Sequence, residues 1–292
     1  EDVLFQTAAV DTDADGDIAL PARLGNGLDI LVAADVAGVG ISGQMHGLVM
    51  LDERGEVLHR SILWCDGRTG EECREITETV GAEKLIAITA NPALAGFTAG
   101  KILWVRKHLP EVYKACRHIL LPKDYIRYCL TGQFATEVSD ASGMLLLDVK
   151  NRKWSKEMCE ICGISEEMLP KLYESYECVG CVTEEVAKEL GISATVKVAA
   201  GAGDNAAAAV GTGTVGDGMC NISLGTSGTI FISSDKFGVD KNNALHAFAH
   251  ADGHYHLMGC MLSAASCNKW WAEEILGTRD FAAEQAPIQK LG

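Results

Sequence analysis

Small and hydrophobic residues along the chain define one strand-to-helix turn more clearly than any other element. Residues 196–200 (VKVAA) are small or β-branched, which predicts a buried strand ending at Gly201. Residues 205–210 (NAAAAV) are mostly strong helix formers, so a helix is predicted directly behind Asp204. The turn thus carries a carboxylate at the helix start, after glycines that allow a ligand or a second backbone to approach closely.

Strands and amphipathic helices alternate through the rest of the chain. An apolar strand is predicted over 39–43, and a hairpin over 48–62 with its turn at 53–55. Helical periodicity, interrupted by proline or glycine, predicts helices at 69–80, 99–108, 110–116 and 122–130. No repeat of about 20–50 residues accompanies the alternation, so the pattern predicts an α/β fold rather than a solenoid.

A second hairpin is predicted towards the C-terminal end. Residues 219–224 and 229–233 have the pattern of strands, and the sequence GTSG at 225–228 forms the turn between them. A turn of glycine and hydroxyl residues leaves backbone N–H groups open, which is how a loop binds phosphate. Composition alone favours the alternative, an ordinary tight turn.

Composition excludes several classes of protein. With 292 residues, 48% of them hydrophobic and 22% charged, the chain has the composition of a globular protein large enough for two domains. A net charge of -15 argues against binding to nucleic acid or to an anionic membrane through bulk electrostatics. No apolar run is long enough for a membrane span and no signal-peptide pattern opens the chain. Eleven cysteines fit a reducing compartment better than a disulfide framework, so a cytoplasmic location is predicted.

Two places carry candidate chemistry. Asp204 is placed to act as a general base, and the helix start beside it favours a bound anion; the alternative is an aspartate that only caps the helix. Gln44 and His46 follow the strand at 39–43 and lie between glycines, which suits the hydroxyls of a small polar ligand. A histidine that is satisfied inside its own loop is the alternative there.

A protein-bound metal is not predicted. Cys159 and Cys162, with Cys178 and Cys181, have the spacing of a four-thiolate zinc site. The first pair, however, falls on the periodic segment 154–163, which predicts a helix rather than a zinc knuckle, so buried thiols are the better interpretation. The acidic run at 11–17 is similar to the start of a calcium loop but lacks the glutamate that completes one.

Five separated segments carry a family resemblance. They are residues 40–47 (GISGQMHG), 96–108 (GFTAGKILWVRKH), 121–125 (LPKDY), 201–205 (GAGDN) and 246–250 (HAFAH), the last followed by LSAASC at 262–267. In this order they resemble the FGGY family of carbohydrate kinases, with 96–108 similar to its first signature and the others to its xylulose-phosphorylating members. The resemblance covers residues 37 to 278.

The resemblance implies a fold of two actin-like domains, each related to ribonuclease H, that close on a cleft. Residues 37–215 would be the sugar-binding N-terminal domain, and 216–292 the beginning of the C-terminal ATP-binding domain. Residues 1–36 would be a divergent or incomplete N-terminal segment, because the family's Asp-x-Gly-Thr hairpin has no match there. We therefore expect a chain that is truncated at both ends, with an incomplete second domain and weak or absent ATP binding.

The resemblance also implies an activity, which is ATP-dependent phosphorylation of D-xylulose to its 5-phosphate with Mg²⁺. A kinase for ribulose or glycerol and a non-catalytic sugar-binding remnant are the alternatives. The implied partners are the sugar and ATP, with no nucleic acid and no membrane, and a homodimer is left open.

Site residues follow from the same resemblance. Asp204 corresponds to the proton acceptor, and Asn205 lies where the family contacts the sugar. Met45 and His46 correspond to the substrate-binding pair, with Gln44 beside them. The phosphate-binding loop for ATP would consist of Gly225, Thr226, Ser227, Gly228 and Thr229.

Overall fold

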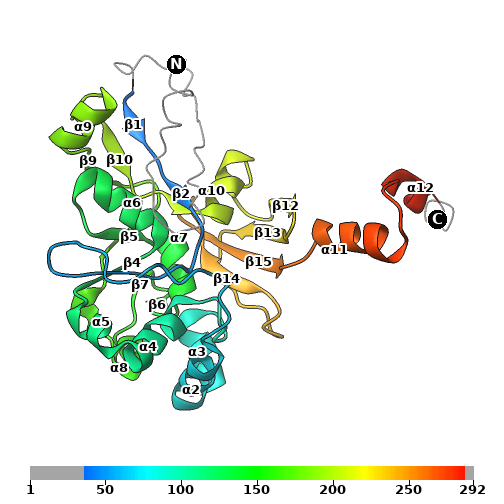
Figure 1. The fold of residues 1–292 in the computed structure, drawn as a ribbon, viewed down its shortest axis with the longest axis horizontal. Helices are drawn as coiled ribbons and strands as arrows, with labels where there is room; N and C mark the ends of the chain where they lie inside the picture. Colours follow the sequence, from blue (N-terminus) through cyan, green and yellow to red (C-terminus); the bar gives the residue numbers. More distant parts are fainter. Residues whose placement is uncertain (1–35, 287–292) are drawn as a thin grey trace.

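The computed structural model describes residues 36–286, so the predictions for the N-terminal segment, including the acidic run at 11–17, lie outside the described residues. Helices and short strands alternate, as the hydrophobic pattern predicted (Figure 1). Within the described part, no helix is both long and apolar enough to cross a bilayer.

Two pairs of parallel strands bring the N-terminal part of the described chain beside its middle. Strand β1 (Gly38–Val39) pairs in parallel with β10 (Lys197–Ala199), which pairs antiparallel with β9 (Cys178–Cys181). A few residues further on, β2 (Ser42–Gly43) pairs in parallel with β11 (Ala202–Gly203). Because both parallel pairs run in the same direction, the residues that follow β2 and β11 emerge at the same end.

Helices surround these strands, and most were predicted from periodicity. The segment 154–163 contains helix α8, as its pattern indicated, and a helix begins at Asp204. The helices of this part are α2 (Gly70–Val80), α3 (Ala82–Thr89), α4 (Thr98–His108), α5 (Pro110–Ala115), α6 (Pro122–Thr131), α7 (Val138–Ala141), α8 (Lys156–Cys162), α9 (Glu184–Leu190) and α10 (Asp204–Gly211).

The hairpin predicted over 48–62 is only partly right. Isolated antiparallel bridges join Leu48 to Ile62 and Leu51 to Val57. The continuous partner of β3 (Val49–Leu51) is instead β4 (His118–Leu120), which comes from far along the chain. All three residues of β3 are buried, so the strand is covered on both faces and its pairing is set by the interior rather than by the local turn.

Four antiparallel strands form a second sheet in the order β12-β13-β15-β14. Strands β12 (Cys220–Leu224) and β13 (Gly228–Ser234) are the predicted hairpin, with the first strand one residue shorter at its start and the second one residue longer at each end. Strands β14 (His246–Ala249) and β15 (Tyr255–Met261) complete the sheet. Helices α11 (Ala265–Trp270) and α12 (Phe281–Gln285) lie to one side of the body of the molecule (orange and red in Figure 1).

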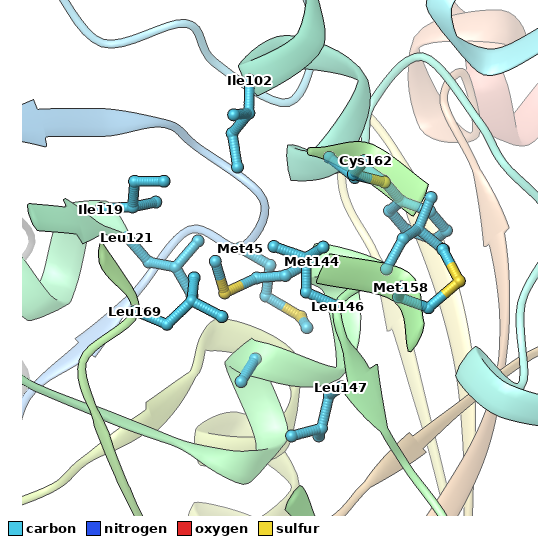
Figure 2. Close-up of a cluster of buried hydrophobic side chains, with 14 of the residues drawn as sticks. Met45, Ile102, Ile119, Leu121, Met144, Leu146, Leu147, Met158, Cys162 and Leu169 are labelled. Atoms are coloured by element: carbon cyan, nitrogen blue, oxygen red, sulfur yellow. The ribbon is translucent and has the colours of Figure 1, made fainter. Parts of the chain in front are cut away.

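One large hydrophobic core joins both parts. It contains residues of α4, β4 and α8 and the side chain of Met45, which lies beside Met144 and Leu146 (Figure 2). Phe231 and Phe248 of the second sheet belong to the same core. The loop after β2 is therefore anchored by apolar packing next to the second sheet.

Candidate active site

The site lies where β2 and β11 end side by side. In the parallel register Ser42 pairs with Ala202 and Gly43 with Gly203. The next residues are Gln44 to His46 on one strand and Asp204 and Asn205 on the other. Two segments that are 160 residues apart in the sequence thus deliver their polar side chains to the same end of the strands, which is where ligands bind in α/β folds.

Asp204 is the first residue of α10, but it is not the N-cap of that helix. The N-cap is Gly203, and the Oδ1 atom of Asp204 accepts hydrogen bonds from the backbone N and the Nδ2 of Asn205, at 2.9 and 3.1 Å. The side chain is open to solvent, but the surrounding protein displaces much of its bulk water. This desolvation raises the pKa of the Asp204 carboxyl, against the lowering effect of the bonds from Asn205.

The backbone that presents Asp204 is held from several sides. Gly201 N–H donates to the carbonyl of Ser175 (3.0 Å), and Ala202 N–H to that of Ile41 (3.0 Å). Gly203 N–H donates to the hydroxyl of Ser139 (3.1 Å), which is fully buried on α7. The turn is therefore fixed by its neighbours and not only by its own sequence.

A buried ionic cluster lies behind this turn. Lys123 contacts Asp124 (2.8 Å), Glu137 (3.1 Å) and Asp140 (3.4 Å), and all four side chains are inaccessible to solvent. Burial opposes the ammonium charge, but the three carboxylates hold the pKa of Lys123 above its ordinary value. Arg127 bonds Asp124 (2.8 Å) and the carbonyl of Ala200, so the cluster reaches the strand that leads to Asp204.

Glu137 connects the cluster to the turn. Its carboxylate accepts the N–H groups of Ser139 (2.7 Å) and Asp140 (3.0 Å) at the start of α7, together with the hydroxyl of Ser175 (2.8 Å). The two carboxyl oxygens of Asp140, by contrast, have no hydrogen-bond partner within residues 36–286, and Lys123 lies 3.4 Å from one of them. Burial raises the pKa of the Asp140 carboxyl well above its ordinary value, although Lys123 opposes this.

His46 is neutral and has a defined tautomer. Its Nδ1 lies 3.1 Å from the carbonyl oxygen of Gly143, which only accepts, so Nδ1 carries the proton and Nε2 is an acceptor. Burial lowers the pKa of His46 to about 3. The ring packs against Phe97, with centroids 4.7 Å apart, and against Phe248 at 6.1 Å. A neutral imidazole acceptor of this kind suits a hydroxyl ligand rather than an anion.

The other predicted sugar-side residues have different surroundings. Met45 is 5% exposed and its side chain packs in the core, so only its backbone is available to a ligand. Gln44 and Asn205 are half-buried. Asn205 bonds Asp204, which orients both side chains.

The turn at 225–228 has the features that a phosphate needs. Its carbonyls are engaged by the following segment, with Ala265 N–H on Gly225 (2.9 Å) and Ala264 N–H on Thr226 (2.9 Å). The N–H groups of Thr226 and Ser227 have no acceptor within the described residues. Gly225 is exposed, and a Cβ there would meet only the Ser227 carbonyl at 3.8 Å, so the turn is open to an approaching anion.

The second sheet contacts the C-terminal end of helix α10, the helix that begins at Asp204. The side-chain amide of Asn221 on β12 donates to the hydroxyl of Thr212, the residue that follows α10 in the sequence (3.0 Å). Cys260 of β15 pairs with Thr229 in the sheet register. The pKa of its thiol is raised by burial and further by the charge of Asp204. The predicted phosphate turn and the predicted base therefore belong to neighbouring elements.

The two cysteine pairs lie on different elements. Cys159 and Cys162 are buried on α8, whereas Cys178 and Cys181 are exposed on β9. Within the part that the structure describes, no group of three or more His, Cys, Asp or Glu side chains is arranged to hold a metal ion.

Several residues around the site were given no role from the sequence, although Thr98 and Lys101 lie in the signature segment 96–108. They are buried polar side chains that support Asp204 or His46, namely Thr98, Lys101, Arg127, Glu137, Ser139 and Ser175. The available signal was a charged residue on an otherwise apolar helix face, as at Lys101 and Arg127. Their partners lie far away in the sequence, so the signal could not have shown what they hold.

The fold is similar to those of solved sugar kinases. The crystal structure of a xyloylose kinase from Brucella ovis has a TM-score of 0.80 and 41% identity, over 88% of this chain and 52% of that one. A gluconate kinase from Lactobacillus acidophilus has a TM-score of 0.78 and 26% identity, over 84% of this chain and 50% of that one. The expected actin-like α/β sugar kinase fold is thus confirmed for the part that the chain covers.

Sequence comparison then gives the family. The N-terminal domain of the FGGY family of carbohydrate kinases matches residues 24–211. The xylulose kinase of Escherichia coli K12 is 47% identical over 257 residues, which are 88% of this chain and 52% of that protein. The chain belongs to the FGGY family of carbohydrate kinases. It spans about half the length of the curated relatives that it matches.

Proposed function

We propose that this protein is an ATP-dependent sugar kinase that phosphorylates D-xylulose to D-xylulose 5-phosphate. The observation that carries the proposal is the 47% identity with a xylulose kinase across 88% of the chain. The convergence of His46 and Asp204 at the ends of β2 and β11 supports it, because a neutral acceptor and a carboxylate base suit a substrate that is rich in hydroxyl groups.

Asp204 is the proposed catalytic base. As the terminal hydroxyl oxygen of the sugar attacks the γ-phosphorus in line, the proton of that hydroxyl passes to the Asp204 carboxylate. The new O–P bond forms while the bond to the bridging oxygen breaks, and ADP leaves. The raised pKa of Asp204 makes it a stronger base than an ordinary aspartate. His46 Nε2, with Gln44, Asn205 and the backbone of Met45, is proposed to hold the sugar hydroxyls.

The turn of Gly225, Thr226, Ser227, Gly228 and Thr229 is the proposed site for the ATP phosphates. The open N–H groups of Thr226 and Ser227 and the hydroxyls beside them are the donors. Mg²⁺ bound with the nucleotide would neutralise charge on the phosphoryl oxygens. We assign residues 37–215 to the sugar-binding domain and 216–292 to the ATP-binding domain on the same basis.

The proposal includes a cytoplasmic location, which the free state of all eleven cysteines supports. The homodimer left open by the resemblance stays a prediction.

The test has two arms, because binding of the sugar and turnover need different parts of the enzyme. Calorimetry of this chain with D-xylulose, D-ribulose, glycerol and gluconate measures the sugar preference directly. In the second arm, this chain replaces the matching region of the E. coli xylulose kinase, and transfer from Mg-ATP is followed by phosphorus NMR. We expect D-xylulose to bind most tightly and to be phosphorylated by the chimera. Preference for another of these sugars would reassign the substrate, and sugar binding by a folded but inactive chimera would favour a non-catalytic sugar-binding protein.

A further inference from the structure

Lys101 is a fully buried cation near the start of α4. Its Nζ lies 2.7 Å from the carbonyl oxygen of His46 and 2.7 Å from that of Gly96. Thr98, one turn earlier on the same helix and equally buried, donates its hydroxyl to the carbonyl of His46 at 3.1 Å. Two side chains of one helix therefore converge on a single backbone oxygen that is 52 and 55 residues away.

That oxygen belongs to a residue in an unfavourable backbone conformation. His46 has φ 69°, in the left-handed region that L-amino acids with a side chain rarely adopt. Such a conformation persists only where the surroundings hold it, at a cost of about 1–3 kcal/mol. The contacts of the imidazole, with the carbonyl of Gly143 and the ring of Phe97, hold the ring but not the backbone from which it projects. The backbone needs its own anchor.

We propose that Thr98 and Lys101 are positioning residues of the sugar site, which hold the carbonyl of His46 and thereby aim its imidazole at the substrate. The role in sugar binding rests on the proposed function, whereas the anchoring of His46 does not. The proposal accounts for both buried polar side chains near the start of α4, because each of them bonds the carbonyl of His46.

Stability alone does not explain a buried lysine at this position. Transfer of an ammonium group out of water is costly, and an apolar side chain of equal length would fill the same space without that cost. Burial lowers the pKa of Lys101 to about 8, while the carboxylate of Asp66 opposes this. Its charge also contributes to the low pKa of the imidazole of His46. Because folding disfavours the charge of Lys101, we attribute its presence to the hydrogen bonds that it makes with the carbonyl groups of His46 and Gly96.

Thr98 gives the cleaner test, because its hydroxyl can be removed without a change of shape. In Thr98→Val we expect the imidazole signal of His46 in proton–carbon NMR to move, and the Kd for D-xylulose to rise about tenfold, the effect of one lost hydrogen bond. Thr98→Ser restores the hydroxyl and should return both readouts towards wild type. Thr77→Val is the matched control, since the Thr77 hydroxyl bonds only the Cys73 carbonyl of its own helix.

The pH dependence gives a second readout that a structural role would not produce. Because folding lowers the pKa of Lys101, loss of its proton favours the folded state, so the free energy of unfolding should rise with pH above about 8. The affinity for D-xylulose should fall over the same range as the carbonyl of His46 loses its charged donor. In Lys101→Met, affinity should be low and should lack this alkaline decline.

The outcomes separate the two levels of the proposal. An unmoved His46 signal in Thr98→Val, with unchanged sugar affinity, would overturn the positioning role while leaving the kinase proposal intact. A wild-type chain that binds none of the sugars, but whose His46 signal moves in Thr98→Val and returns in Thr98→Ser, would retain the anchoring and refute the sugar site. If Lys101→Met does not fold, the pair of Thr98 variants decides.

Discussion

At the scale of the residue, the position of the His46 imidazole requires glycine at position 143. A Cβ at position 143 would lie 2.1 Å from its Nδ1 and 2.2 Å from its Cε1. Gly143→Ala must therefore displace a ring that Gly143, Phe97 and Phe248 confine. We expect a loss of about 1–3 kcal/mol in the free energy of unfolding and about a tenfold weaker Kd for D-xylulose.

Denaturant unfolding and calorimetry measure these two effects. Gly70→Ala is the control, because a Cβ there meets nothing within 4 Å and position 70 begins helix α2. Gly143→Ala with wild-type sugar affinity would show that His46 does not contact the sugar.

Asp204 makes a prediction about pH. Proton abstraction requires the carboxylate, so kcat should fall as pH drops through a pKa that lies above the ordinary value of about 4. Asp204→Asn in the chimera should lower kcat by about 10² to 10⁴ and abolish this acid limb. Sugar affinity should change far less, and near wild-type turnover of the variant would end the assignment of Asp204 as the base.

The same shift has the opposite effect on stability. Because folding raises the pKa of Asp204, its contribution is most favourable below the pKa of the unfolded chain and is lost as pH rises through the folded pKa. In Asp204→Asn the side chain cannot ionise, so the variant lacks the loss of stability that ionisation of Asp204 causes. Its Tm at pH 7 should thus equal or exceed that of the wild type, which thermal unfolding will show.

At the scale of the element, the turn between β10 and α10 tolerates no side chain at its first glycine. Gly201 has φ 79°, and a Cβ there would lie 2.1 Å from the carbonyl oxygen of Ile41. Gly201→Ala combines backbone strain of about 1–3 kcal/mol with a clash against the parallel strand. We expect marked destabilisation and separation of β2 from β11, with loss of sugar binding.

Denaturant unfolding again provides the measurement. Gly211→Ala, at the end of α10, is the matched control, since a Cβ there meets nothing within 4 Å and its stability should be unchanged or slightly raised. Equal stability of the two variants would contradict the close parallel pairing.

This turn also shows how much the sequence could predict. The strand, the glycines and the helix start at 196–205 are local features, and they were predicted correctly because propensity and periodicity act over a few residues. The pairing of β3 with β4 is non-local and was missed. For the same reason, the residues that could bind ligand were recognisable from motifs, whereas Ser139, which supports Gly203 across 64 residues, was not.

At the scale of the whole molecule, the two parts of the described chain share one core. Phe231, Phe248 and Met258 of the second sheet pack with Met45 and the helices of the larger part. The face that carries Phe231 and Phe248 makes most of this contact, and the opposite face contributes at β14, through Ala247 and Ala249. The position of the turn at 225–228, the proposed phosphate site, is therefore set by apolar packing that connects the second sheet to the larger part.

Over β12, β13 and the end of β15, the opposite face of the second sheet is exposed and apolar. Ile222 and Leu224 of β12, Ile230 of β13 and Met261 of β15 are 61%, 71%, 45% and 53% exposed. In the sheet register Ile222 lies opposite Ile230, and Leu224 and Met261 both flank Gly228, so these side chains form one surface. A contiguous apolar surface of this kind promotes association in water.

We expect this chain to associate in a concentration-dependent manner through that surface, and salt provides a way to recognise it. The net charge of -15 makes the molecules repel each other, and salt screens this repulsion, so association should increase with ionic strength. Sedimentation velocity at several salt concentrations measures this association.

The double variant Ile222→Thr with Ile230→Thr should weaken association without a change in net charge. Val57→Thr, which replaces an exposed valine outside the sheet, should not weaken it. A chain that stays monomeric at every concentration and salt level would contradict the prediction, and equal association of both variants would place the contact elsewhere.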